Sequence, residues 1–409
     1  MELEIRPIAP EEYSTFVRTD DAAFGERHAD DFIEALRPLT ELDRTLAAFD
    51  GERMAATAAA FSFELTLPGL TRLPVAAVTA VGVLPTHRRR GLLRALMRRQ
   101  LANVRERGEA IAALTCSESA IYGRFGYGLA TSTIAVEMDR RHAGFARPVE
   151  TSGRMTLLDH EQALPVFAAL YDRVRRSQPG ALGRSAEYWK VALRDPTQPA
   201  GDLGPRFYAV YESGVGDVEG AVHYRVKLQW EHGLAGNTLE IGELIAATPE
   251  AYAALWHFCL NMDLVHLVRA RNRPVDETLR WMLADPRRLR VASLIDDLWV
   301  RLVDVPAALA ARRYGAADRL VLDVSDPFRL EQTGRYALEG GPEGAQCHLT
   351  TADADLTLDV ADLGAAYLGG VRFTTLARAG RVRALTSRAL ERADALFASD
   401  PAPWCATSF

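Results

Sequence analysis

Apolar residues recur along this chain in two spacings, and each spacing predicts a different kind of element. Residues 44–69 contain two apolar runs on either side of Asp50-Gly51, a strong turn dipeptide, so they predict a β-hairpin. Residues 73–85, LPVAAVTAVGVLP, are almost continuously apolar, which is typical of a strand with both faces covered. The pattern therefore predicts a sheet in the first part of the chain.

A helical period follows directly after this strand. From Gly91 to Arg107 the apolar residues return with a period near 3.6, which predicts an amphipathic helix. Residues 110–118 then predict another buried strand, and residues 10–24 predict a helix near the start of the chain. Strands and helices thus alternate in this part.

The same order of elements returns in the middle of the chain. Residues 206–228 predict a second hairpin, residues 239–263 a strand, a turn and a helix, and residues 264–270 a further strand. Where the first copy has LPTHRRRGLL, the second has AATPEAY, so the basic glycine turn is absent. We interpret this order as an internal repeat with one altered copy; two unrelated α/β stretches are the alternative.

A third part, from about Arg290, has a different pattern. Its end, between residues 362 and 398, is helical in pattern, and residues 306–314 predict a helix between its first two strands. The expected strands are residues 298–305, 319–326, 334–340, 346–351 and 354–360. Strands packed under several helices form an α+β domain, so α+β is the predicted fold class of the chain.

Composition and charge exclude several classes of protein. The length of 409 residues suggests two or three domains, and the net charge of -6 argues against a general nucleic-acid binder. No window approaches the ~18 uninterrupted apolar residues of a membrane span, and the N-terminus lacks an apolar signal core. We therefore expect no membrane span and a cytoplasmic location. The four cysteines lie far apart without a metal-binding spacing, which favours reduced thiols and no metal.

The residues THRRRG join the apolar strand to the amphipathic helix, and their chemistry suits an anion. Arg88, Arg89 and Arg90 carry planar guanidinium groups that match phosphate oxygens, and Gly91 lets a phosphate approach the backbone. The helix N-terminus adds free backbone N–H groups and the positive end of the helix dipole. The combination predicts a pyrophosphate site; a solvated, basic helix start is the alternative.

The spacing of this turn resembles the acetyl-coenzyme A loop of the GNAT acyltransferases. Arg88-x-x-Gly91 matches that loop, although Leu93 stands where those enzymes usually have a small residue. VGVLPTHRRRGLLR and SESAIYGRFGYGLAT closely resemble the enhanced intracellular survival (Eis) family of GNAT N-acetyltransferases. AAYLGGVRFTTLARAGRV and the terminal phenylalanine resemble it too, so the resemblance spans nearly the whole chain.

This resemblance implies a domain organisation and an activity. It implies a GNAT catalytic domain at residues 1–150, a degenerate GNAT-like domain at 151–290, and a sterol-carrier-like α+β domain at 291–409 whose end reaches the active site. It also implies a homohexamer that uses acetyl-CoA to acetylate several amines of polyamino substrates such as aminoglycosides. A protein lysine acetyltransferase and a non-enzymatic lipid- or sterol-binding module are the alternatives.

The family's coenzyme-binding roles fall on matching positions. The backbone of Val81-Gly82-Val83 would pair with the pantetheine amides, and Ser117 and Glu118 would lie beside the thioester. The other residues that the resemblance assigns to the coenzyme are Arg88, Arg89, Arg90, Gly91, Leu92, Leu93, Arg94 and Arg124.

The resemblance also assigns the proton transfers. Tyr122 would be the general acid, the terminal carboxylate of Phe409 the general base, and Glu26 would line the amine pocket. Such a pair suits amine acetylation, because a base must take a proton from the ammonium and the leaving thiolate must gain one. The alternatives are packing for Tyr122 with Tyr127 as the acid, a frayed chain end, and a solvated helix face for Glu26. Cys116 is expected to be a buried thiol.

Overall fold

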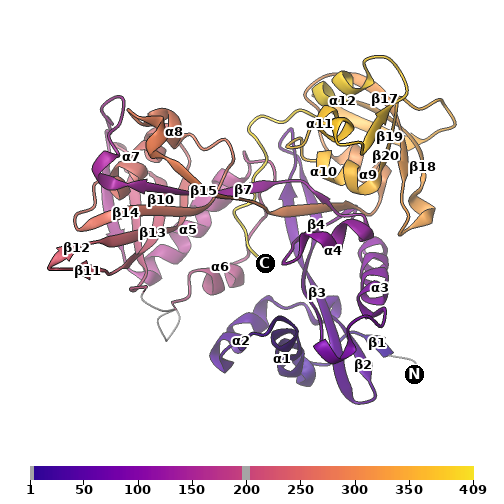
Figure 1. The fold of residues 1–409 in the computed structure, drawn as a ribbon, viewed down its shortest axis with the longest axis horizontal. Coiled ribbons are helices and arrows are strands. Elements are labelled where there is room, and N and C mark those ends of the chain that lie inside the picture. Colours follow the sequence, from indigo (N-terminus) through magenta and orange to yellow (C-terminus); the bar gives the residue numbers. More distant parts are fainter. Residues whose placement is uncertain (1–3, 196–202) are drawn as a thin grey trace. The chain divides into compact units, whose positions relative to one another are not determined.

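The computed structural model describes residues 4–195 and 203–409. By its internal contacts the chain divides into two compact units (Figure 1). The first unit holds the described residues up to Thr131, together with Pro179–Gly183 and Asp296–Phe409. The second holds Ser132–Gln178 and the described part of Arg184–Ile295. Each unit therefore combines segments that lie far apart in the sequence.

A seven-stranded sheet in the first unit contains the predicted hairpin. β2 and β3 pair antiparallel on either side of Asp50-Gly51, and β3 pairs antiparallel with β4. The predicted strand at residues 73–85 forms most of β4, and the one at 110–118 forms β5. In sheet order the strands are β1 (Glu4–Arg6), β2 (Leu46–Asp50), β3 (Arg53–Thr66), β4 (Arg72–Val83), β5 (Ile111–Thr115), β16 (Leu298–Leu302) and β6 (Gly128–Leu129).

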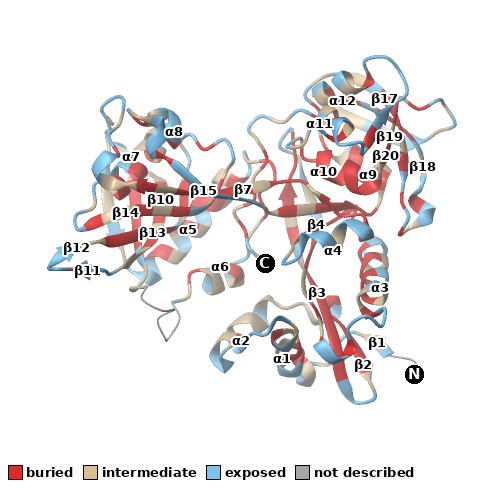
Figure 2. Ribbon diagram, in the orientation of Figure 1, coloured by how far each residue is buried: buried red, intermediate tan, exposed pale blue. Residues whose placement is uncertain are grey.

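Helices cover both faces of this sheet. Successive side chains of a strand point to opposite faces. Ala47 of β2 accordingly shares a core with Tyr13, and the next residue, Ala48, shares another with Leu96. The helices are α1 (Tyr13–Phe24), α2 (Asp30–Leu36), α3 (Leu92–Glu106) and α4 (Ser119–Tyr122). α1 and α2 thus lie on one face and α3 on the other, and buried residues run along β3 between them (Figure 2).

The sheet opens between β4 and β5. These two strands pair in parallel only from Val75–Ile111 to Ala77–Ala113, although both are described to their ends at Val83 and Thr115. On its other side β4 bulges: its pairing with β3 shifts register, and Ala80 has a φ of 49°. A bulge bends a strand, so β4 turns away from β5. The opening leaves backbone groups of β4 for a ligand.

A second seven-stranded sheet forms the second unit, as the repeated order of elements predicts. In sheet order its strands are β15 (Arg290–Asp296), β7 (Ser132–Asp139), β14 (Val265–Arg273), β13 (Asn237–Ala246), β10 (Val218–Lys227), β9 (Phe207–Glu212) and β8 (Arg154–Leu158). The other elements are α5 (His160–Arg175), α6 (Ala186–Ala192), α7 (Pro249–Leu260), α8 (Leu279–Met282), β11 (Trp230–Glu231) and β12 (Leu234–Ala235). Apolar residues of α7, such as Leu255 and Trp256, form its core with β10 and β13.

The third part of the sequence folds as the α+β region that its pattern predicts. Its five-stranded sheet has the order β19 (Gly344–Leu349), β18 (Gly334–Gly341), β17 (Asp318–Ser325), β20 (Leu356–Asp359) and β21 (Val382–Ala384). Its helices are α9 (Val305–Ala311), α10 (Val360–Ala366), α11 (Phe373–Arg378) and α12 (Ala389–Phe397). The first unit therefore holds two sheets.

One predicted strand lies in an unexpected sheet. Residues 298–305 predict a strand of the third part, but their first five residues form β16, which pairs antiparallel with β5 and β6 of the first sheet. The prediction of the sheet was wrong. Strands that follow one another in sequence usually lie side by side in one sheet, but β16 lies apart from the strands that follow it. Similarly, β7 comes directly after β6 of the first sheet in sequence, but it pairs with β14 of the second sheet. The domain boundaries near residues 150 and 290 stay predictions.

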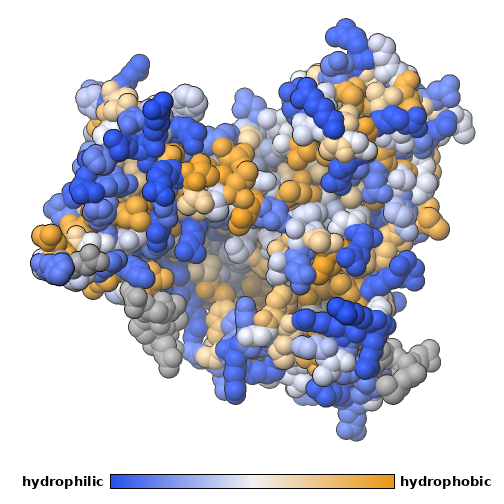
Figure 3. Space-filling model, viewed as in Figure 1, coloured by the Kyte–Doolittle hydropathy of each residue, from blue (hydrophilic) through white to orange (hydrophobic). Residues whose placement is uncertain are grey.

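Two further features of the described residues bear on function. Among residues 4–195 and 203–409, no helix is both long and apolar enough to cross a membrane. Within the same ranges no three His, Cys, Asp or Glu side chains gather as a metal ligand set. Hydrophilic and hydrophobic residues are mixed over the face drawn in Figure 3.

Candidate active site

A cavity of about 1370 Å³ lies in the first unit, at the opening between β4 and β5. Residues 78–83 of β4 and residues 115–118 at the end of β5 form two of its walls. Other parts of the wall come from α1 and the segment after it, the start of α3, and α4. Residues 327–328 and the terminal Phe409 complete it. The fold thus joins segments from the first third of the sequence and from its last part around one space.

All but one of the predicted site residues line this cavity. The exception is Arg90, which is exposed and takes no part in the wall. The predicted residues in the wall are Glu26, Val81, Gly82, Val83, Arg88, Arg89, Gly91, Leu92, Leu93, Arg94, Ser117, Glu118, Tyr122, Arg124 and Phe409.

Gly91 opens the start of α3 to the cavity. It is the N-cap residue, with φ 83° and ψ 1°, and no side chain caps the helix there. This left-handed conformation favours glycine, and a Cβ built on Gly91 would meet no atom within 4 Å. An uncapped helix start beside open space is the geometry of an anion site.

The arginines of the turn differ in what they contact. Arg88 donates hydrogen bonds to the carbonyl oxygens of Ala23 at 2.8 Å and Val83 at 3.3 Å, so it holds the turn against α1 and β4. Arg89 is exposed, and within the described residues no hydrogen bond or ion pair occupies it. Arg94 lies with its guanidinium 5.8 Å from the ring centre of Phe328. Arg89 and Arg94 are thus the residues best placed to reach a phosphate.

Acidic groups line another part of the wall. Asp20 of α1 accepts a hydrogen bond from the Thr57 hydroxyl at 3.1 Å, and burial raises the pKa of its carboxyl to about 6. It lies against β4, since a Cβ on Gly82 would come within 2.7 Å of its Oδ1. Glu26 and Glu118 line the same cavity and are exposed. A carboxyl group with a pKa near neutrality can accept a proton from an ammonium group.

Tyr122 lies in the wall, whereas its rival does not. Burial first, and the charges of Cys116, Asp20 and Glu118 after it, raise the pKa of Tyr122 to about 12. Its ring packs edge-on against Tyr127 with centres 5.9 Å apart. Tyr127 is completely buried, is not among the wall residues, and its hydroxyl has no partner within the described part of the chain. Only Tyr122 can therefore present its hydroxyl to a ligand in the cavity.

The sequence predicts a buried thiol at Cys116, but the residue is half-buried and lines the cavity. Its thiol donates to Asp296 Oδ2 at 3.1 Å. Burial first, and Asp296 second, raise the pKa of the thiol to about 12. A protonated thiol bonded to a carboxylate is a poor nucleophile, so Cys116 does not suit covalent catalysis.

The chain end is docked in the cavity wall. The terminal carboxylate of Phe409 accepts a hydrogen bond from the Thr115 hydroxyl at 3.3 Å, and its ring meets Phe63 edge-on at 5.8 Å. Upstream, the N–H of Trp404 donates to the carbonyl of Pro179 at 2.9 Å, and Thr407 is buried. Frayed ends lack such contacts.

The two proposed proton-transfer groups approach the opening from opposite faces of the sheet. Leu114 lies in the core beneath α3, so the next residue, Thr115, points to the face of α1 and holds the Phe409 carboxylate there. Tyr122 packs against the core beneath α3. The opening between β4 and β5 connects the two faces.

Several wall residues were not predicted from the sequence, among them Asp20, Thr115 and Phe328. Asp20 stands in the amphipathic pattern of α1 beside Asp21, and nothing local distinguishes the acid whose pKa is raised from the one that pairs with His28. Thr115 ends an apolar strand, and Phe328 lies in a loop of the third part. Only burial and tertiary contacts reveal their places.

The corresponding helix start in the second unit is closed. The Thr248 hydroxyl caps α7 by accepting from the N–H of Ala251 at 3.2 Å, and Pro249 at the first position has no N–H. Glu250 adds a negative charge in the first turn. These groups oppose an anion, which agrees with the predicted absence of a second coenzyme site.

Comparison with known families defines the class. The acetyltransferase (GNAT) domain matches residues 4–130, a second acetyltransferase (GNAT) domain matches residues 180–302, and the sterol carrier protein domain matches residues 305–406. This confirms the interpretation of the first two parts as a repeat and the predicted α+β organisation. Together with the opened sheet and the uncapped helix start, these matches define a GNAT-type N-acetyltransferase.

Individual relatives narrow the class to a family. An uncharacterized N-acetyltransferase of Streptomyces coelicolor is 41% identical over the full length of both chains. The N-acetyltransferase Eis of Mycobacterium tuberculosis is 35% identical, over 93% of this chain and 92% of that one. The crystal structure of Eis1 from Mycobacterium abscessus superposes with a TM-score of 0.88 at 36% identity, covering 99% of this chain and 100% of that one. The chain belongs to the Eis family of GNAT N-acetyltransferases.

Proposed function

We propose that this N-acetyltransferase uses acetyl-CoA to acetylate amines of small polyamino molecules such as aminoglycosides, at more than one position. One observation carries the proposal: a single cavity has an uncapped helix start and arginines in one part of its wall and four carboxyl groups in another. The first part suits the phosphates of a coenzyme, and the second suits a molecule with several ammonium groups.

The donor side fits coenzyme A. Gly91 leaves the first turn of α3 open, and Arg89 and Arg94 can reach a pyrophosphate there. Backbone groups of Val81-Gly82-Val83, on the bulged end of β4, can pair with the pantetheine amides. When bound, acetyl-CoA supplies the acetyl thioester. These residues would hold and orient it along the opening of the sheet.

The acceptor side is acidic. Asp20, Glu26, Glu118 and the terminal carboxylate of Phe409 line the cavity, and Asp20 approaches β4 at Gly82. Carboxylates attract ammonium groups, and hydrogen bonds to charged groups contribute about 1.5–3 kcal/mol each. Several carboxylates in one cavity suit a substrate with several amines, and they suit one singly charged amine less well.

The proton transfers follow from the two faces of the opening. The Phe409 carboxylate, held by Thr115, would accept a proton from the ammonium group directly or through a water. Tyr122 keeps its proton throughout the physiological range because its pKa is raised to about 12. Its hydroxyl would therefore always be ready to donate toward the departing sulfur, helped by position rather than by acidity.

The test is turnover of acetyl-CoA over matched panels of aminoglycosides, linear polyamines and lysine-containing peptides, with products weighed by mass spectrometry. We expect aminoglycosides to be preferred and to gain more than one acetyl group. A higher kcat/KM on lysine peptides than on every small amine would favour the protein acetyltransferase alternative. Absence of acetyl transfer to all three panels would overturn the proposal.

Two further expectations rest on the family resemblance. We propose a homohexamer, which native mass spectrometry of the purified protein tests, and a cytoplasmic location, which cell fractionation tests. A monomer or a dimer at micromolar concentration would contradict the first. Recovery of the protein in a membrane or culture-fluid fraction would contradict the second.

A further inference from the structure

Phe328 brings the sterol-carrier-like region into the cavity wall. Its ring meets Phe125 edge-on at 5.0 Å and lies 5.8 Å from the guanidinium of Arg94 and 5.9 Å from that of Arg98. It belongs to the core beneath α3, on the opposite face of the sheet from α1. Phe328 therefore faces the donor part of the cavity, away from Asp20.

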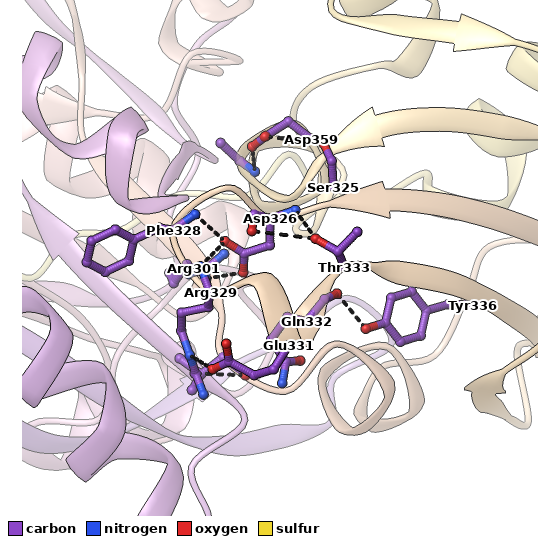
Figure 4. Close-up of polar contacts among 12 residues, drawn as sticks. Arg301, Ser325, Asp326, Phe328, Arg329, Glu331, Gln332, Thr333, Tyr336 and Asp359 are labelled. Atoms are coloured by element: carbon purple, nitrogen blue, oxygen red, sulfur yellow. Dashed lines mark hydrogen bonds and ion pairs between the residues drawn. The ribbon is translucent and has the colours of Figure 1, made fainter.

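The loop that carries Phe328 is held rigidly. Asp326 accepts from the backbone N–H groups of Phe328 at 3.2 Å and Arg329 at 2.9 Å, and its own N–H donates to Thr333 Oγ1 at 2.9 Å. Its other carboxylate oxygen pairs with Arg301 of β16, and both side chains are fully buried (Figure 4). The loop is thus tied to the first sheet by a buried ion pair.

Such an ion pair specifies a geometry more than it adds stability. Burying two charges costs several kcal/mol, which their attraction in a low dielectric roughly offsets, so a buried pair is weak evidence of stabilisation. Here it holds one aromatic ring beside the cavity. Figure 4 shows Phe328 on one side of the loop and Tyr336 of β18 on the other, with the Tyr336 hydroxyl turned toward Gln332.

We propose that Phe328 binds the adenosine bisphosphate half of the coenzyme, so that the sterol-carrier-like region forms part of the donor site. The inference rests on the proposed use of acetyl-CoA. The pantetheine half would follow the opening between β4 and β5, and the pyrophosphate would lie at Gly91 and Arg94. The remaining half must leave on the α3 face, where Phe328 offers an aromatic ring and Arg94 and Arg124 offer positive charge.

The size of the effect follows from stacking. Removing an aromatic ring from under a nucleobase weakens binding by about 5- to 100-fold. Phe328 is mostly covered by its neighbours, with 9% of its surface exposed, so the lower half of this range is expected. For truncated donors without adenosine, replacement of Phe328 should leave kcat/KM unchanged.

The experiment compares Phe328→Leu, which keeps apolar volume without the ring, with Phe328→Trp and wild type. Leu330→Ala, an exposed residue of the same loop, is the matched control. Two donors are used, acetyl-CoA and acetyl-4′-phosphopantetheine. Binding of adenosine 3′,5′-bisphosphate alone is measured by calorimetry, as a readout independent of turnover.

We expect Phe328→Leu to lower kcat/KM for acetyl-CoA about 5- to 20-fold, to leave the truncated donor unchanged, and to weaken the nucleotide by the same factor. Phe328→Trp and Leu330→Ala should behave as wild type. Equal losses on both donors would make Phe328 merely structural and overturn the inference, as would unchanged nucleotide affinity. Failure of the wild type to use acetyl-CoA at all would instead refute the proposed function.

Discussion

Replacement of Asp20 should make the protein more stable and less active. Burial raises the pKa of this carboxyl from an ordinary value of 3.8 to about 6, so ionising it in the folded state costs free energy. Asp20→Asn keeps the size and can still accept the hydrogen bond from Thr57. The amide carries no charge at any pH, so the cost disappears.

The magnitude follows from the difference in pKa. A difference of about two, at about 1.4 kcal/mol each, corresponds to about 3 kcal/mol at pH 8. Because the folded pKa is the higher one, the wild type is free of this cost below pH 3.8 and acquires it as the pH rises through about 6. The advantage of Asp20→Asn should therefore be about half its full size at pH 5 and nearly complete at pH 8.

Differential scanning calorimetry at pH 5 and pH 8 measures this difference. For a unit of roughly 250 residues we expect Asp20→Asn to raise the Tm at pH 8 by roughly 5–10 °C, and by less at pH 5. Asp21→Asn is the control of opposite sign. Burial of Asp21 is outweighed by hydrogen bonds from His28, which lower the pKa of that carboxyl, so its loss should destabilise at pH 8.

Activity gives the second half of the test. If Asp20 faces the amine, Asp20→Asn should raise the amine KM by about 10- to 100-fold and leave the acetyl-CoA KM unchanged. Stability gained at the cost of activity is the signature of a functional group held in an unfavourable environment. A lower Tm at pH 8, or an equal change at both pH values, would refute the reasoning.

Three other predictions concern the donor loop and the proton transfers. Arg89→Ala should raise the acetyl-CoA KM about 10-fold. Gly91→Val should raise it more, because a side chain strains the backbone at a φ of 83° and blocks the approach of a phosphate. Unchanged coenzyme affinity in both variants would show that this loop does not bind the phosphates. Tyr122→Phe should fold normally by circular dichroism and lose about 10²–10⁴ in kcat; near-normal turnover would assign the acid role to water. One residue appended after Phe409 moves the carboxylate by roughly 3.5 Å, beyond hydrogen-bond reach, so a carboxy-terminal tag should abolish most turnover and an amino-terminal tag should not. Full activity in a well-folded, extended chain would exclude the terminal carboxylate as the base.

The sequence by itself determined the features that depend on neighbours along the chain. Asp50-Gly51 specifies its hairpin, the 3.6 period specifies α3, and Gly91 between a buried strand and that helix specifies the uncapped helix start. These signals are local, because turn geometry and the facing of side chains are set within a few residues. The order of elements likewise indicated the repeat, since each copy preserves its own patterns.

The tertiary structure decided which strands pair and which groups are buried. Nothing in the sequence pattern of β16 indicates that it joins the first sheet, because an apolar strand can pair with any compatible neighbour. The bulge near Ala80 that opens β4 from β5 depends on the strands on both sides.

Tertiary contacts also distinguish Asp20 from Asp21, two adjacent acids whose pKa values shift in opposite directions. The pKa of a carboxyl group depends on its desolvation and on nearby charges and hydrogen bonds. Asp20 is hydrogen-bonded by Thr57, which is distant in sequence, and Asp21 by His28, which the turn after α1 brings back to it. Tertiary contacts with residues distant in sequence likewise position Phe328 and Phe409.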